Sequence, residues 1–422
     1  MHNMIFKPTR HKLGISTLII VMIFYSFGTG FAFFFRLLYA ILLTMSIGIL
    51  WAWLNLRGLD VRLNRNDISG QVGGYLQGEV QIINRYRLPK SWISVREISD
   101  LPGYTYGRGI GLVKNQRRSW KIEAYLTRRG VFQIGEIEII SQDPFGLFKL
   151  HRRFLTPEEF VVFPKTEPLP NLDPSLANLP SDNRVTLRSE QITTDSAAIR
   201  AYKPGDSLRR IHGPYTARMN TLMVKEFESG ISSDSWIIMD MHNLTHVGND
   251  PSDNTEELTI TIGASLINRL HGLSIPVGLA ANAETDYTFN PDRNPDQIRK
   301  LMHSMATMNS SGRITLERFI YNLEPHFSNY SSLIVITPST NTGWITALNT
   351  LKRKGIKVSA IYIDPTGFDN TRYPEPVVTS LSEHEISSFI VHRGQSIDDA
   401  LSTPVNMTTF AETFKRDITK TL

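Results

Sequence analysis

The feature that most constrains this chain is an apolar stretch over residues 13–56, in which Arg36 is the only charged side chain. As one helix its 44 residues would be roughly 66 Å long, about twice the ~30 Å hydrocarbon core of a bilayer. Two passes fit better, so residues 1–56 are predicted to form a two-helix transmembrane hairpin. The turn is expected near residues 28–30 (Gly-Thr-Gly), with Arg36 as the alternative. Trp51 and Trp53 suit the interfacial belt at the end of the second pass.

The charges that flank this stretch predict its orientation. The flanking cations are Lys7, Arg10 and Lys12 before it, and Arg57, Arg62 and Arg65 after it. A hairpin puts both groups on one side of the membrane, and the positive-inside bias makes that side cytoplasmic. A cleaved signal peptide is the competing interpretation, but no A-x-A-like site follows and a second apolar block comes at once. The chain is therefore expected to be a multi-pass protein of the cell membrane with cytoplasmic soluble domains.

Composition narrows the chemistry and the partners. The 422 residues include no cysteine, which excludes disulfides, thiolate metal sites and cysteine nucleophiles. Residues 57–165 hold 18 Lys and Arg against 11 Asp and Glu, so the basic part of the chain adjoins the membrane segment, where anionic lipid would favour it. This surplus is dispersed and lacks an aromatic-basic motif, so membrane lipid is an expected partner and nucleic acid is not.

Residues 57–165 are predicted to form a small antiparallel β-sandwich. Alternating or β-rich runs are separated by Gly, Pro and Asn clusters, which is the spacing of such a fold. The expected strands are residues 78–84, 91–98, 119–126, 131–140 and 160–163. Asp143 and Pro144 start a turn that is expected to direct Phe145 and Phe148 toward a core. Residues 166–232 then have turn-forming composition and little periodicity, and are assigned as a linker.

Residues 233–365 alternate strands with helices, which predicts a doubly wound, mostly parallel α/β sheet. The expected strands are 235–241, 275–281, 287–289, 332–337 and 357–363, and the expected helices are 254–270, 296–308, 316–327 and 343–354. Ligands of such folds meet the carboxyl ends of the strands. The polar residues expected there are Asp240, His242, Asn243, Thr337, Ser339 and Asn341. Residues 366–422 are assigned as a C-terminal extension with a possible strand at 389–391 and helix at 396–401.

A charged motif over residues 198–229 lies inside the linker. Residues 203–206 (Lys-Pro-Gly-Asp) favour a rigid turn, after which Asp206 or Ser207 can cap a helical turn. A basic run and a Lys-Glu-Phe-Glu sequence follow. Two interpretations remain: an ordered linker braced by structural ion pairs, or a surface that faces a partner.

Three separated motifs together resemble one family, the domain of unknown function 58 family. They are Arg128-Arg129-Gly130 with Gly135, residues 143–148 (DPFGLF), and Arg200-x-Tyr202-x-Pro204-Gly205-Asp206 followed by Arg209, Ile211, Ala217-Arg218, Leu222 and residues 225–228 (KEFE). The resemblance extends from the membrane hairpin to about residue 401. One departure is Gly213, which stands where the family usually has Trp.

The resemblance implies a fold and a function. The fold is a membrane-anchored protein with a von Willebrand factor A-like domain. The function is that of a non-enzymatic adaptor or scaffold in complex assembly or maturation, with a MoxR-type AAA+ ATPase and in some cases a transglutaminase-like membrane protein as partner. Partner binding is assigned to the motif residues Arg200, Tyr202, Asp206, Arg209, Arg218, Lys225 and Glu226.

The same resemblance raises a metal question at Asp240. Von Willebrand A domains often bind Mg²⁺ through an Asp-x-Ser-x-Ser loop, and here residues 240–244 read Asp-Met-His-Asn-Leu. Only Asp240 matches, and Mg²⁺ prefers oxygen to imidazole, so no cofactor is expected, and a Mg²⁺-dependent adhesion or protein-binding module is the alternative function. The sequence holds no G-x-x-x-x-G-K-[ST], H-E-x-x-H or G-x-S-x-G motif, so no catalytic residue and no enzyme activity are predicted.

Overall fold

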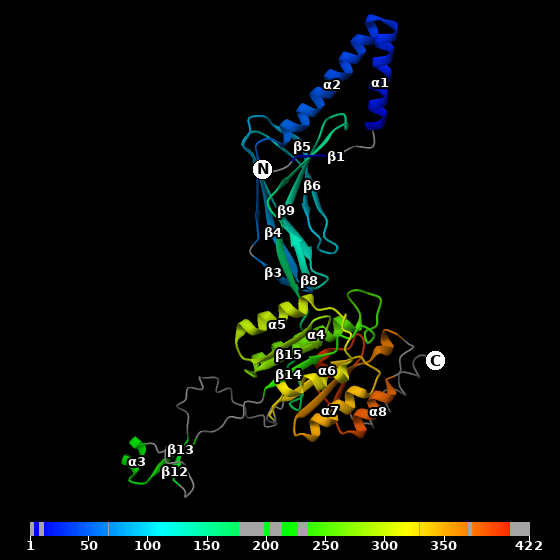
Figure 1. Ribbon diagram of the computed structural model, residues 1–422. Helices are drawn as coiled ribbons and strands as arrows, with labels where there is room; N and C mark the ends of the chain where they lie inside the picture. The colour runs from blue at the N-terminus through cyan, green and yellow to red at the C-terminus, as the bar shows by residue number, and fades with distance from the viewer. Residues whose placement is uncertain are drawn as a thin grey trace. The chain divides into compact units, whose positions relative to one another are not determined.

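The computed structural model describes residues 4–7, 12–65, 67–176, 198–202, 213–226, 234–328, 330–369 and 374–405. Contacts divide the chain into two compact units, Met1–Lys165 with Met302–Met308 and Thr166–Leu301 with Asn309–Leu422. The content is mixed: apolar helices at the N-terminus, antiparallel sheets after them, and a sheet that alternates with helices in the second unit (Figure 1).

Two apolar helices begin the first unit, α1 (Lys12–Thr29) and α2 (Ala32–Leu56). Among the described residues, α2 is the one helix long and apolar enough to cross a membrane, since the apolar part of α1 is limited to Ser16–Thr29. The 25 residues of α2 extend about 38 Å. The break falls at Gly30, whose φ of +65° suits glycine, and Arg36 lies inside α2.

Antiparallel sheets make up the rest of this unit, and all of their strands follow α2 except β1, which precedes α1. The strands are β1 (Met4–Lys7), β2 (Leu59–Asn64), β3 (Ser69–Gln71), β4 (Tyr75–Asn84), β5 (Lys90–Ile98), β6 (Tyr106–Leu112), β7 (Arg117–Tyr125), β8 (Gly130–Ile134), β9 (Glu136–Gln142), β10 (Lys149–Phe154) and β11 (Glu158–Phe163). They form sheets in the orders β1-β10-β9-β5-β6, β2-β4-β7 and β3-β11-β8, and only the β3–β11 pair is parallel among the described strands.

The first two of these sheets share one apolar core. Side chains along each strand alternate between the core and the surface. In β7, for example, Trp120, Ile122 and Ala124 are buried and the residues between them are exposed. The core joins Val80 and Ile82 of β4 to side chains of β5 and β9, and it also takes in the last turns of α2.

The second unit is built on a six-stranded sheet in the order β16-β15-β14-β17-β18-β19. Its strands are β14 (Ser235–Met239), β15 (Val277–Asn282), β16 (Asp286–Asp292), β17 (Ser332–Thr337), β18 (Lys357–Ile363) and β19 (Ser387–Val391). All neighbours are parallel except β16, which lies antiparallel at the edge beside β15. The sheet therefore runs past residue 365, where the sequence analysis ended this domain, because the possible strand predicted at 389–391 is β19 and pairs with β18.

Helices cover both faces of this sheet (Figure 1). They are α4 (Thr255–Gly272), α6 (Leu316–Leu323), α7 (Gly343–Arg353), α8 (Glu375–Glu383) and α9 (Ile397–Ala400). Helix α5 (Pro295–Thr307) is divided between the two units. Trp236 and Ile238 of β14 pack with α6, α7 and α8, whereas Met239 faces the other way and contacts Gly263 of α4. Asn254 caps α4 as predicted, because its side chain accepts a hydrogen bond of 2.8 Å from Glu257 N.

The charged motif contributes a small separate arrangement to the described residues. Strands β12 (Ala198–Ala201) and β13 (Met223–Glu226) pair antiparallel around the short helix α3 (Gly213–Met219). Thr216 Oγ1 accepts a hydrogen bond of 3.0 Å from Met223 N, and this bond ties the helix to the second strand.

Candidate binding crevice

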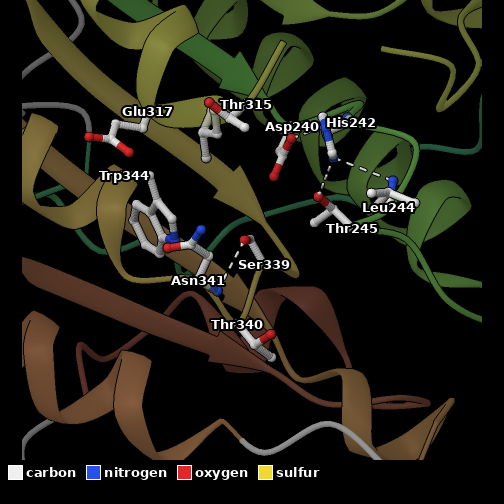
Figure 2. A pocket seen from close by; sticks show the side chains of 11 residues that line it. Asp240, His242, Leu244, Thr245, Thr315, Glu317, Ser339, Thr340, Asn341 and Trp344 are labelled. Carbon is white, nitrogen blue, oxygen red and sulfur yellow. Dashed lines mark hydrogen bonds between the residues drawn. The ribbon is translucent and has the colours of Figure 1, made fainter. Parts of the chain in front are cut away.

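The sheet order creates a crevice beside β14. The chain passes from β14 through α4 to β15 on one side, and β17 lies on the other side, so the loops that follow β14 and β17 turn away from each other. Ligands of parallel α/β sheets bind at this switch point. The crevice there has a volume of about 260 Å³. Its walls are Asp240, His242, Leu244, Thr245, Thr315, Leu316, Glu317, Ser339, Thr340, Asn341 and Trp344 (Figure 2).

Asp240 lies at the base of the crevice and ties three strands together. It is 1% exposed. Its Oδ2 accepts a hydrogen bond of 2.7 Å from Thr337 Oγ1 at the end of β17, and its Oδ1 accepts one of 3.2 Å from Asn282 Nδ2 at the end of β15. The main-chain N–H of His242 also donates to Oδ1, at 3.2 Å. The carboxylate is therefore occupied by neutral donors of the chain itself, as a buried carboxylate requires.

The loop after β14 is shaped by two histidines. Leu244 N donates to His242 Nδ1 at 3.3 Å, so this ring nitrogen is an acceptor within its own turn. His246 Nε2 lies 2.6 Å from Asp240 O and therefore carries the proton that it donates. Burial lowers the pKa of His246 below its ordinary value although the nearby Asp240 carboxylate acts against this, so the ring is neutral at pH 7.

Gly312 fixes the same loop through its backbone. Its N–H donates to Met241 O at 3.0 Å, and its carbonyl accepts from Asn243 N at 2.9 Å. A Cβ at this position would lie 1.7 Å from Asn282 O, so only glycine fits between the two strand ends.

Two polar groups on the crevice wall have no partner within the described part of the chain. Trp344, in the first turn of α7, is 2% exposed, and its Nε1 makes no hydrogen bond. Glu317, in the first turn of α6, has neither a hydrogen bond nor an ion pair among the described residues, and its carboxylate lies against Gly343. At the rim, Leu244 is 73% exposed. Figure 2 shows Trp344 and Glu317 on one side of Asp240 and Leu244 on the other.

The loop after β14 does not offer the ligands of a typical Mg²⁺ loop. Asp240 already accepts three hydrogen bonds, His242 turns its Nδ1 to its own loop, and the side chain of Leu244 offers no ligand atom. The described residues contain no group of three or more His, Asp or Glu that could hold a metal ion. Mg²⁺ requires several oxygen ligands in octahedral geometry, and within residues 240–244 only Asp240 supplies a carboxylate.

The predicted partner-binding residues lie elsewhere in the chain. The backbones of Arg200, Lys225 and Glu226 belong to the β12–β13 pair. Tyr202 is half-buried and donates its N–H to Leu222 O at 2.8 Å. Arg218 is exposed at the end of α3. Asp206 and Arg209 lie outside the described residues.

Sequence reasoning placed Asp240, His242, Ser339 and Asn341 at the edge of the sheet, and the structure brings these four together in the crevice wall. It missed Glu317 and Trp344 because they begin helices instead of following strands. A search of the first turns of helices that enter at the same edge would have found both.

Comparisons with solved structures cover only parts of the chain. The CARDB domain of a Pyrococcus furiosus protein, solved in complex with di-metal ions, is 14% identical with a TM-score of 0.19, and the match covers 25% of this chain and 91% of that one. Proximal thread matrix protein 1 from the mussel byssus is 18% identical with a TM-score of 0.29, over 40% of this chain and 44% of that one. Such TM-scores are too low to support any argument about fold or function.

Comparison with protein families is more specific. No curated protein matches the chain at a significant level. The family model described as protein of unknown function DUF58 matches residues 198–364. This region carries the charged motif, the strands β12 to β18 and the whole crevice wall. Residues 198–364 of this chain therefore belong to the DUF58 family.

Proposed function

We propose that this chain is a membrane-anchored, non-enzymatic adaptor that holds a peptide segment of a partner protein in the crevice beside β14. The observation that carries the proposal is the Glu317 carboxylate on the crevice wall, which has neither a hydrogen bond nor an ion pair among the described residues. A cationic ligand can form a charge-assisted hydrogen bond with such a carboxylate.

The chemistry of the crevice wall selects a peptide that carries a cation. The Glu317 carboxylate accepts hydrogen bonds from a Lys or Arg side chain, and Leu244 adds apolar contact at the rim. The crevice volume of about 260 Å³ lies just below the range of ~300–1,000 Å³ for pockets that hold drug-sized ligands. It suits one or two side chains of a larger partner.

The strand order supports a von Willebrand factor A-like domain for the second unit. Numbered within the sheet, β16-β15-β14-β17-β18-β19 is the order 3-2-1-4-5-6 with an antiparallel edge strand. Doubly wound domains of this order place ligands at the switch point beside the first strand. Glu317 lies at this place.

The partner and location follow from the family resemblance and the helices. We infer that the partner is a MoxR-type AAA+ ATPase acting in complex assembly or maturation, with a transglutaminase-like membrane protein as a further candidate and no nucleic acid. Helix α2, with α1 as a shorter second pass, anchors the chain in the membrane. The flanking cations place the soluble units in the cytoplasm. The motif residue Arg218 is exposed and suits a second contact with the same partner.

A crosslinking pull-down from native membranes, with the chain tagged at its C-terminus, tests this function. We expect recovery of a MoxR-type ATPase, and we expect Glu317→Lys to reduce it about tenfold, which corresponds to about 1.4 kcal/mol. Glu383→Lys is the matched control, because Glu383 is an exposed glutamate of α8 outside the crevice. Recovery that is unchanged by Glu317→Lys would refute the crevice as the binding site. Recovery of extracellular proteins alone would refute the cytoplasmic adaptor.

A further inference from the structure

The carboxyl end of α2 is built into the first unit. Ala52 and Leu56 are fully buried in the core that the two large sheets share. Lys90 Nζ donates to Leu54 O at 2.5 Å, and Asn55 exchanges two hydrogen bonds with the backbone of Ser91, at 3.1 and 3.3 Å. A cation on the last carbonyls of a helix suits its dipole. Burial lowers the pKa of Lys90 to about 8. These contacts fix the adjoining loops at the level of the helix end.

The turn over residues 143–148 extends further along α2. A Cβ on Gly48 would lie 3.4 Å from the Phe148 ring and 3.5 Å from Asp143, and Gly48 precedes Leu56 by about 12 Å along the helix. Asp143 holds the turn, because its carboxylate accepts from Phe145 N at 3.0 Å and from Phe148 N at 2.6 Å. Phe148 is buried, but Phe145 is 63% exposed. The prediction that Phe145 points into a core is therefore wrong.

A second aromatic side chain is presented by a β-bulge. The β5–β6 register shifts between Lys90 and Ile93, so that Lys90 points inward and Trp92, with a φ of +43°, is 75% exposed. Such a bulge re-aims side chains, and strained backbone is concentrated at functional positions. The two neighbouring loops also present apolar side chains, because Leu88 and Val113 are exposed. Asn84 holds these loops together, since its Nδ2 donates to the carbonyls of both residues.

The charges of these loops have one sign. Residues 85–92, 113–118 and 143–149 contain a single acid, Asp143, which is buried and internally bonded. Their exposed cations are Arg87, Lys114, Arg117, Arg118 and Lys149, together with Arg85, which is paired with Asp60 at 2.6 Å. Exposed aromatic and aliphatic side chains among cations are typical of surfaces that enter the interface of an anionic bilayer.

We propose that these three loops form a lipid-binding surface, which places Phe145 and Trp92 in the interfacial layer of an anionic bilayer around the end of α2. The inference rests on the membrane anchoring in the proposed function. The bilayer is the occupant because α2, to which the turn of Phe145 is packed, is the helix long enough to span it. One helix end does not fix the tilt of the first unit on the membrane. The lipid-binding surface sets this tilt.

Nitroxide accessibility tests the surface directly. The chain has no cysteine, so single labels can be placed at Phe145→Cys, Val113→Cys, Leu43→Cys in the middle of α2, and Thr105→Cys in the loop at the other end of β5 and β6. The full chain is reconstituted in nanodiscs of phosphatidylglycerol and phosphatidylcholine, or of phosphatidylcholine alone. The measurement is the ratio of oxygen to nickel-chelate accessibility, which is high in lipid and low in water.

We expect the labels at 145 and 113 to have ratios between those of Leu43 and Thr105, at least about threefold above Thr105. The ratio at 113 should fall toward that of Thr105 in phosphatidylcholine alone. If the Leu43 label is in lipid and both loop labels match Thr105, the lipid-binding surface is refuted and the anchoring stands. If the Leu43 label is in water, both are refuted. Equal ratios at 113 in the two lipid mixtures would refute the role of the cations.

Discussion

Replacing Gly312 with alanine should disrupt the loop that forms one wall of the crevice. The added Cβ would lie 1.7 Å from Asn282 O and 2.9 Å from Met241 O. Close carbon–oxygen contacts in proteins are about 3.3 Å or more, so the backbone at Gly312 has to move away by more than about 1 Å. Both neighbours are backbone atoms, and no flexible side chain can give way instead.

The cost of this movement follows from the bonds it breaks. Gly312 exchanges hydrogen bonds with Met241 and Asn243, at 3.0 and 2.9 Å, each with a net value of about 1 kcal/mol. Overpacking of a close-packed site adds about 1–3 kcal/mol when the strain is spread over the surroundings. Gly312→Ala should therefore destabilise the loop by about 2–4 kcal/mol. It should also weaken partner binding in the crevice.

Hydrogen exchange measured by mass spectrometry on the full chain is the suitable assay, because it resolves the loop from the rest of a multi-unit protein. The amides of residues 241–243 should exchange at least about 30-fold faster, the equivalent of 2 kcal/mol. Gly272→Ala is the matched control: nothing lies within 4 Å of its Cβ, and alanine in a helix is better than glycine by up to about 1 kcal/mol. Unchanged exchange of residues 241–243 in Gly312→Ala would refute the reasoning.

Three further predictions concern Asp240 and its neighbours. Thr337→Val removes the hydroxyl that donates to Asp240 Oδ2. It should lower the free energy of unfolding, measured in urea, by about 1.5–3 kcal/mol. The control Thr350→Val loses only a hydrogen bond to its own helix and should change this free energy by less than about 0.5 kcal/mol. Burial lowers the pKa of His246 below its ordinary value of 6.5, so below pH 6.5 the unfolded chain binds the proton better than the folded chain. The free energy of unfolding should therefore fall, as the pH is lowered, by up to about 1.4 kcal/mol per pH unit. His246→Gln should remove this slope. Calorimetry with Mg²⁺ or Mn²⁺ should give no heat, because the oxygens of Asp240 are occupied.

Each of these has a contradicting outcome. Equal losses in Thr337→Val and Thr350→Val would show that Asp240 does not need its hydroxyl donor. The same pH slope in His246→Gln and in the wild type would assign the proton uptake to another group. A one-to-one heat with Mg²⁺ that disappears in Asp240→Asn would restore the metal-dependent interpretation.

Local signals predicted much of the second unit. The strands β17 and β18 have the predicted bounds because continuous apolar runs between turn signals mark buried strands. The pairing of strands that lie far apart in the chain has no comparable local signal. Strand β1 (Met4–Lys7) pairs with β10, more than 140 residues later in the chain. Strand β19 was expected at 389–391, but its pairing with β18 was not. Phe145 was misplaced because Asp143 and Gly146 set the direction of the turn, and this direction depends on φ values that composition does not encode.

The candidate site was predictable only where it follows strands. Asp240 was placed at the sheet edge, but its role depends on Asn282 and Thr337, which meet it from two other strands. The sequence shows the aspartate of a magnesium loop, but it cannot show which hydrogen-bond donors its carboxylate oxygens meet. Glu317 and Trp344 come from the starts of two helices, and no spacing in the sequence links them to the strand ends.

The arrangement of the two crevice carboxylates argues for a cationic ligand. Asp240 is held at the base by neutral donors only, so its negative charge is stabilised but not cancelled by a cation. Glu317, on the wall, has no counter-charge among the described residues. In the reduced dielectric of a crevice, two acidic groups that share one opening create a negative potential that neither would create in water. In the proposed function, a Lys or Arg side chain of the partner would relieve this potential, whereas an acidic or apolar side chain would not. The charge-reversed variant Glu317→Lys should therefore weaken binding more than the uncharged variant Glu317→Gln. Equal losses in the two variants would show that shape, and not charge, selects the partner.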